Sequence, residues 1–184
     1  MYRLKGIIIL LVFMTALTGC RPVPVEYILR LISDEQHEEI KFSDNILFSI
    51  NNGAAGYGTR AECTDAEIIV YTDKTVKIFM VQTDYSTVSE IGNVVLSEED
   101  YVKLVELADR DTIYNLKVRD GEGEDGSASY ITLYDENDET LISKGGYMAY
   151  GDEYWEMYDG IKEILKPYDI DEIVDAHREI LDAE

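Results

Sequence analysis

The chain has 184 residues, with 38 Asp and Glu against 16 Lys and Arg, which gives a formal net charge of −22. This charge argues against nucleic acid as a partner and against contact of the folded part with anionic lipid, because both require Lys and Arg facing phosphates. Apolar residues make up 46% of the chain, which is enough for the core of one domain. Two cysteines cannot build a disulfide scaffold or a four-cysteine zinc site, and we expect no cofactor.

The first residues are typical of an export signal. Arg3 and Lys5 precede an almost wholly apolar run over residues 6–17. Its 12 residues suit the central segment of a secretory signal peptide and fall short of the ~20 that a membrane-spanning helix needs. The run ends in the tetrapeptide Leu17-Thr18-Gly19-Cys20.

This tetrapeptide resembles the lipobox of bacterial lipoprotein precursors. The resemblance implies that a lipid with acyl chains such as palmitate is attached to Cys20, and that residues 1–19 are removed as a signal peptide. The protein would then be anchored by lipid to the cell membrane, facing the extracytoplasmic side, with residues 20–45 as anchor and tether. The alternatives are a plain signal peptide, or a short membrane anchor, with a chance cysteine. The region after Cys20 is similar to small bacterial lipoproteins of no assigned activity.

The next part of the chain alternates strand and loop patterns. Residues 25–42 fit a helix or a strand equally well. The predicted strands that follow are residues 46–50, 67–71 and 75–81. Residues 51–59 contain three glycines and form a predicted loop. The pair Asp73-Lys74 separates the second and third strands, which indicates a hairpin.

A helix is predicted to begin at Ser97. The sequence Ser97-Glu98-Glu99-Asp100 resembles a capping box, with Asp in place of the usual Glu. The apolar stripe of this helix is predicted to consist of Tyr101, Leu104, Val105 and Ala108.

The last third of the chain contains a second hairpin and two helices. Residues 130–134 and 140–144 are its predicted strands, residues 153–166 form a helix that ends before Pro167, and residues 171–182 form the last helix. Strand pairs this close in sequence have no room for helical crossovers. We therefore predict an α+β fold, an antiparallel sheet built from hairpins with two to three helices packed on one face, as a single acidic, monomeric domain over residues 46–184.

The glycine-rich loop at 51–59 is one candidate binding site. Its backbone N–H groups would suit an anion, and Arg60 directly after it could add a bidentate contact. The alternative is a wide turn between two strands.

An aromatic segment is the second candidate. Tyr147, Tyr150 and Trp155 would suit stacking on a sugar ring or anchoring of a peptide. The alternative is that the segment belongs to the core, since Tyr154, Tyr158 and the apolar residues after them lie on one helical face. Trp155 projects at the edge of that face.

No metal site is expected. Residues 120–126 alternate Gly with acidic residues as an EF-hand loop does, but Asp125 occupies the sixth position, where glycine is required. Ile131 occupies the twelfth position, where Glu is required.

Catalytic patterns are missing from the sequence as well. It contains no nucleophile elbow, zinc-protease or phosphate-loop motif. His37 is expected to be solvated and His177 to be a hydrogen-bonded core residue. Cys63 is expected to be a buried or inert thiol rather than a nucleophile.

These observations favour a non-enzymatic binding or interaction module, tethered through Cys20, whose partner is an envelope protein or a glycan. Two alternatives stay open. One is a small cell-envelope hydrolase that uses a pair of carboxylates, and the other is a structural assembly lipoprotein.

Overall fold

The structure is a computed structural model that describes residues 40–52, 58–119 and 127–183. The chain divides into two units, Met1–Ile40 and Lys41–Glu184, and the second holds all of the described secondary structure.

Several predicted features lie outside the described residues. These are the signal peptide, Cys20, His37, most of the glycine-rich loop and the acidic loop at 120–126. Within the described ranges, no helix is both long and apolar enough to cross a membrane.

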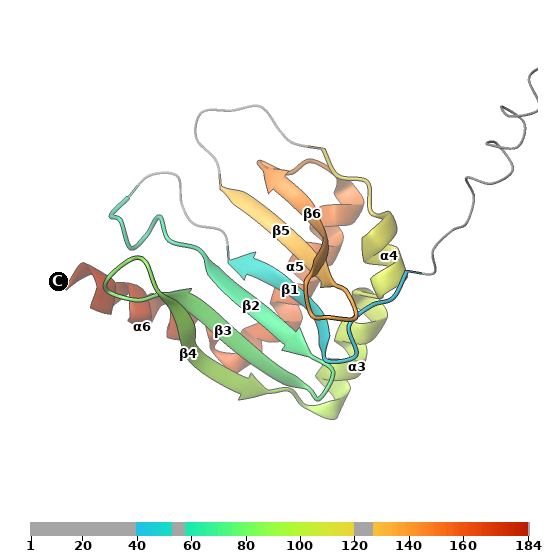
Figure 1. The fold of residues 1–184 in the computed structure, drawn as a ribbon, viewed down its shortest axis with the longest axis horizontal. Coiled ribbons are helices and arrows are strands. Elements are labelled where there is room, and N and C mark those ends of the chain that lie inside the picture. The colour runs from blue at the N-terminus through green and yellow to red at the C-terminus, as the bar shows by residue number, and fades with distance from the viewer. Residues whose placement is uncertain (1–39, 53–57, 120–126, 184) are drawn as a thin grey trace, which may run out of the picture. The chain divides into compact units, whose positions relative to one another are not determined.

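Six strands form one antiparallel sheet in the order β4-β3-β2-β1-β5-β6 (Figure 1). Their bounds are Ile46–Asn52 for β1, Ala66–Tyr71 for β2, Thr75–Val81 for β3, Val88–Val95 for β4, Ala128–Tyr134 for β5 and Thr140–Tyr147 for β6. The two predicted hairpins, β2–β3 and β5–β6, are confirmed. In the first, the backbone N–H of Thr75 donates to the Asp73 carboxylate (2.9 Å), and Lys74 adopts a positive φ of 74°.

Strand β4 is not predicted by the sequence pattern. Its apolar residues are interrupted by Ser89, Glu90, Gly92 and Asn93, so it lacks a clear alternation. Gly92 has a packing role, because a Cβ there would lie 2.9 Å from Cγ2 of Ile173. The glycine allows the last helix to approach the sheet closely at this edge.

The helices lie together behind the sheet in Figure 1, which leaves the other face open. They are α3 (Glu98–Leu107), α4 (Arg110–Asn115), α5 (Asp152–Leu165), the short 3-10 helix η1 (Lys166–Tyr168) and α6 (Ile170–Asp182). The predicted α+β class is therefore confirmed. Helix α4 is an addition to the prediction, and the Asp109 carboxylate caps it by accepting from Thr112 N.

The N-terminus of α3 confirms half of the predicted capping box. Ser97 Oγ accepts from the N–H of Asp100 at 3.1 Å. Asp is one methylene shorter than Glu, and the return bond to the N–H of Ser97 is made by the hydroxyl of Tyr168 instead (2.8 Å). That hydroxyl in turn donates to the Asp100 carboxylate at 2.8 Å, and this bond is the main reason that the pKa of Asp100 is lowered.

The covered face of the sheet and the helices enclose the core. The predicted stripe of α5 is buried, namely Tyr154, Met157, Tyr158, Ile161 and Leu165. Tyr154 donates its hydroxyl to Ser129 Oγ (2.8 Å) on β5. The stripe predicted for α3 is wrong at Val105, which is 37% exposed, because Leu104 and Ala108 are the residues that point into the core.

The domain begins a few residues earlier than predicted. Residues 41–45 belong to the compact unit rather than to a tether. Phe42 forms an isolated bridge with Asp135, and the buried Ser43 donates its N–H to the carbonyl of Tyr134 at 2.9 Å.

Candidate binding groove on the open face of the sheet

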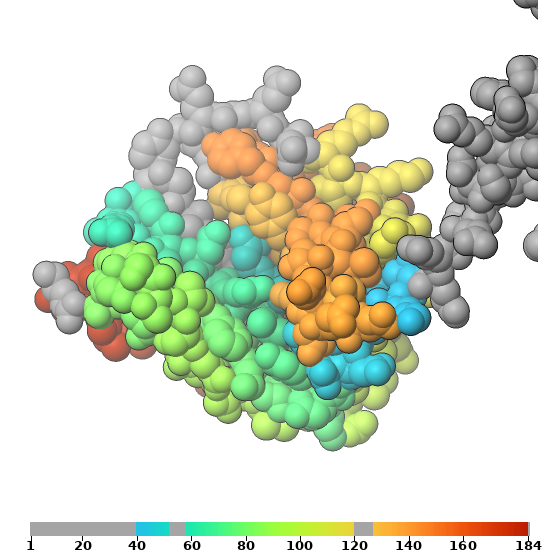
Figure 2. Space-filling model, viewed as in Figure 1, coloured from blue at the N-terminus to red at the C-terminus, as the bar shows by residue number. Residues whose placement is uncertain are grey.

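The open face of the sheet carries a shallow groove. Figure 2 shows this face hollowed between the green strands β3 and β4 and the orange strands β5 and β6. The groove has a volume of about 410 Å³, within the range of small-molecule and peptide sites. All six strands contribute to its lining, which consists of Ser49, Asn51, Asp65, Ala66, Glu67, Phe79, Met80, Val81, Val88, Tyr130, Thr132 and Ser143.

Part of the groove lies where the pairing between β1 and β5 ends. The backbone ladder between these strands covers Ser49–Thr132 and Ile50–Ile131. Beyond it, the side chain of Asn51 replaces the ladder: its Nδ2 donates to the carbonyl of Ala128 at 2.9 Å, and its Oδ1 accepts from Tyr130 N at 2.6 Å. The Asn51 amide thus connects β1 to β5 where the backbone pairing ends.

The floor of the groove contains a cluster of three oxygen-bearing side chains. Ser49 is only 2% exposed, and its hydroxyl donates to Oε1 of Glu67 at 3.0 Å. Tyr134 reaches across β1 and donates to the same Oε1 at 2.8 Å. Burial raises the pKa of Tyr134 far above its ordinary value, so this hydroxyl remains a donor at neutral pH.

Both hydroxyls lie within hydrogen-bond distance of the same oxygen of Glu67, and they are also 2.8 Å from each other, where either can donate. The other oxygen, Oε2, has no hydrogen-bond partner within the described residues. The carboxylate is thus held through Oε1 by buried hydroxyls, and Glu67 itself is exposed at the groove surface.

An aromatic ring lies between two carboxylates on this face. The strand register places Phe79 opposite Glu67 of β2 and opposite Glu90 of β4. Glu90 is paired with Lys77, with Nζ and Oε2 3.0 Å apart. As far as the structure describes the chain, Glu67 is bonded only to neutral hydroxyls, so it brings an uncompensated negative charge beside the ring.

The side chain of Arg60, the predicted anion contact, packs against an aromatic ring of a neighbouring loop. Its guanidinium lies 3.7 Å from the ring centroid of Tyr85, in the loop between β3 and β4. The neighbouring Thr59 donates its hydroxyl to Asp182 at 3.0 Å. These contacts hold the turn around Arg60 against the loop and the end of α6, and its role in anion binding stays a prediction.

The three predicted aromatic contacts are in different settings. Tyr150 is 71% exposed, and its backbone pairs with Arg119. Trp155 is 37% exposed, its indole N–H donates to the carbonyl of Ala149 at 2.8 Å, and its ring contacts are with Tyr154 and Tyr158.

Tyr147 ends β6 and pairs with Ala128 of β5. This register places Tyr147 on the open face, whereas Trp155 belongs to the helix layer. In the described part of the chain, no ring contact joins Tyr147 or Tyr150 to Trp155. The role of Tyr147, Tyr150 and Trp155 as a common ligand platform stays a prediction.

Two further predicted residues are resolved. Of the buried or inert thiol predicted for Cys63, the buried alternative is wrong because Cys63 is exposed, and the inert thiol stays a prediction. It lies in a turn where its N–H donates to the carbonyl of Thr59 at 3.1 Å. His177 has Nε2 2.8 Å from the carbonyl of Val81, which confirms the predicted hydrogen bond, but the side chain is half-buried rather than in the core.

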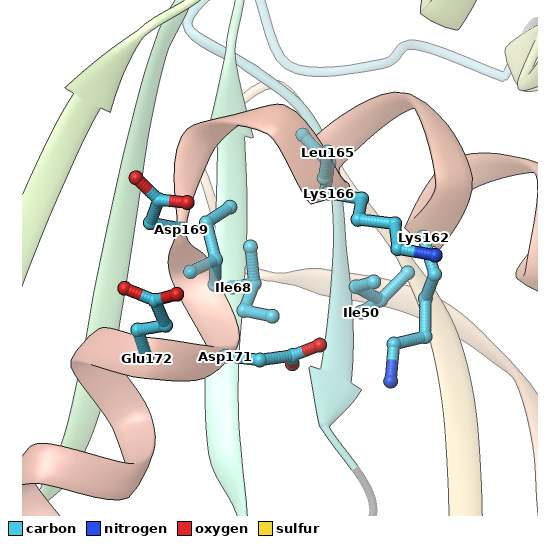
Figure 3. A pocket seen from close by; sticks show the side chains of 9 residues that line it. Ile50, Ile68, Lys162, Leu165, Lys166, Asp169, Asp171 and Glu172 are labelled. Carbon is cyan, nitrogen blue, oxygen red and sulfur yellow. The ribbon is translucent and has the colours of Figure 1, made fainter.

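A second cavity lies at the junction of α5 and α6. Figure 3 shows Lys162 and Lys166 on one side of it and Asp169, Asp171 and Glu172 on the other. Its volume is about 150 Å³, and its lining charges have both signs. In the described ranges, no cluster of three or more His, Cys, Asp or Glu side chains could hold a metal ion.

No family model matches the chain, and no curated protein or solved structure is significantly similar to it. A functional proposal must therefore come from the groove and from the residues around it.

Proposed function

We propose that the protein is an extracytoplasmic lipoprotein that acts as a non-enzymatic binding module, with the groove on the open sheet face as its binding surface. The groove is the observation that supports this proposal most directly. It combines exposed apolar and aromatic side chains with hydroxyls and a fixed carboxylate, the mixture that binding sites use for affinity and orientation.

The anchor is proposed from the sequence Leu17-Thr18-Gly19-Cys20. A lipid on Cys20 would hold the domain at the membrane surface, and two or three acyl chains are enough for stable anchoring. The negative charge of the domain would keep it away from anionic lipid, so that the groove stays accessible to a partner in the aqueous phase.

The hydrolase alternative lacks a specific supporting observation. A carboxylic acid that acts as a general acid near neutral pH needs a raised pKa. All described carboxyl groups with a displaced pKa are displaced downward, for example Asp138, mainly because Ser43 donates to it. The assembly alternative differs from our proposal only in the identity of the partner, an envelope protein.

Metabolic labelling tests the anchor. Cells that express the full chain are grown with a labelled fatty acid, and we expect label on the protein. Cys20→Ser should abolish it, because a hydroxyl does not replace the thiolate as the site of alkylation. Label that survives this substitution would refute the lipoprotein proposal.

Site-specific photo-crosslinking tests the binding surface in intact cells. A photoreactive amino acid is placed in the full chain at Ser143, which is exposed at the rim of the groove, or at Glu179, which is exposed on α6. We expect a discrete adduct with an envelope protein or a glycan from position 143 only. Equal adducts from both positions, or none from position 143, would contradict a binding role for the groove.

A further inference from the structure

The geometry points to an extended basic peptide segment of a partner protein as the occupant of this groove, with an Arg or Lys side chain beside Phe79 and against Glu67. This inference rests on the proposed binding function and specifies the class of ligand. The lining residues named above all belong to one compact unit.

The charge of the groove selects for a cation. The described residues that line it include Asp65 and Glu67 and no Lys or Arg. Glu67 is held by two neutral donors on Oε1, so it does not have to leave an ion pair in order to bind a cation through Oε2. The whole chain carries a net charge of −22, which attracts a basic partner and repels an acidic one.

The aromatic ring makes a guanidinium or ammonium group preferable to a metal ion. Phe79 is opposite Glu67 in the register, so a planar cation could contact the ring face and the carboxylate together. The stem of an Arg or Lys side chain is apolar and would cover Val81 and Val88 at the same end of the sheet.

The length of the groove favours a polypeptide over a compact molecule. Its lining extends from Val88 on β4 to Ser143 on β6, across all six strands of the sheet. At a strand spacing of about 4.8 Å, the groove crosses about 24 Å, which matches about seven residues of extended chain. The hydroxyls of Thr132 and Ser143, which are 2.9 Å apart in an exposed hydrogen bond, lie on this path and have further hydrogen-bonding capacity for peptide groups.

Fluorescence anisotropy tests this inference with the full chain in an uncharged detergent. The probe is a labelled eight-residue peptide that alternates Arg and Val, and the control peptide carries citrulline, a neutral isostere, in place of Arg. Measurements at about 0.15 M salt screen long-range attraction between the peptide and the acidic protein. We expect saturable binding of the Arg peptide and much weaker binding of the citrulline peptide.

Two matched charge variants locate the binding. Glu67→Gln keeps the acceptor for Ser49 and Tyr134 but removes the charge, and it should weaken binding about tenfold. Glu179→Gln removes the same charge from the exposed surface of α6 and should change the dissociation constant by less than about twofold. Phe79→Leu, with a thermal melt as the check on folding, should also weaken binding, because the ring quadrupole is lost while most of the volume remains.

Several outcomes would overturn the inference. These are equal binding of the Arg and citrulline peptides, equal effects of the two charge variants, or competition by free arginine amide as strong as that of the peptide. If the photo-crosslinker at Ser143 captures a partner in cells while the Arg peptide neither binds nor competes, the ligand class is wrong and the binding function stands. If both experiments fail, the function proposed for the groove fails as well.

Discussion

The two faces of one sheet differ in chemistry although the same strands build both. On β3, Val76, Ile78 and Met80 face the helices and are fully buried, whereas Lys77 and Phe79 alternate with them toward the open side. The covered face is almost entirely aliphatic, and the open face combines aromatic rings, hydroxyls and carboxylates. Burial of aliphatic side chains stabilises the fold without chemical specificity, while the mixed face is only partly needed for stability and is available for recognition.

The largest expected difference between the faces comes from two phenylalanines on different strands. Phe48 on β1 is 0% exposed in the core, and Phe79 on β3 is half-buried on the open face. Phe48→Ala should lower the free energy of unfolding by about 3–5 kcal/mol, and Phe79→Ala by about 1 kcal/mol, because less apolar area is lost from a partly exposed site. Urea unfolding curves of both variants measure this, and equal losses would contradict the division between the faces.

A pH experiment compares two buried tyrosines. Burial raises the pKa of Tyr154, on the helix side, to about 12, and it raises the pKa of Tyr134, on the open face, still further. In the unfolded chain a tyrosine ionises near pH 10, so the folded state binds more protons above that pH. Stability should therefore be fully present below about pH 10 and should fall as the pH rises toward 12.

Urea midpoints between pH 8 and pH 11 test this expectation. Tyr154→Phe should lower stability by about 1 kcal/mol at pH 8, through loss of the bond to Ser129, and should reduce the further decline at high pH. Tyr150→Phe, at a 71% exposed position, is the matched control and should change neither. An alkaline decline that is the same in all three proteins would show that these hydroxyls do not cause it.

Substitution of Arg60 should have a smaller effect on the free energy of unfolding, because Arg60 lies in a turn and not on either face of the sheet. Its guanidinium stacks on Tyr85, a contact worth about 0.5–1 kcal/mol at an exposed site. Arg60→Ala should lower the free energy of unfolding by that amount and leave binding of the Arg peptide unchanged. Arg119→Ala serves as the control, because Arg119 is exposed and its backbone pairs with Tyr150 rather than with the turn around Arg60. A loss of peptide binding without a loss of stability would contradict this purely structural role for Arg60.

The sequence predicted the local parts of the fold because their causes are local. The Asp73-Lys74 turn, the Ser97 cap and the stripe that contains Tyr154 are each set by residues a few positions apart. Strand β4 was missed because its alternation is broken at Gly92, and the reason for that glycine is Ile173, 81 positions further along the chain.

The groove could not be predicted for the same reason. The antiparallel hairpins were evident, but the position of β1 between β2 and β5 depends on contacts across most of the chain. Only that order brings Ser49, Glu67 and Tyr134 together. Nothing in the local sequence distinguishes Glu67 from the other acidic residues. The aromatic segment, in contrast, could be recognised from the sequence because its residues are close together in the chain.

The smallest expected effect concerns Cys63, which is exposed and outside both faces. Cys63→Ser should change the free energy of unfolding by less than about 0.5 kcal/mol, since no core contact is lost. The thiol should react with Ellman's reagent at once, without denaturant, and a reductant should not lower the melting temperature. The same reaction counts the free thiols of the full chain. One reactive thiol is expected when Cys20 carries lipid and two when it does not, whereas a thiol that reacts only after unfolding would contradict the exposed position of Cys63.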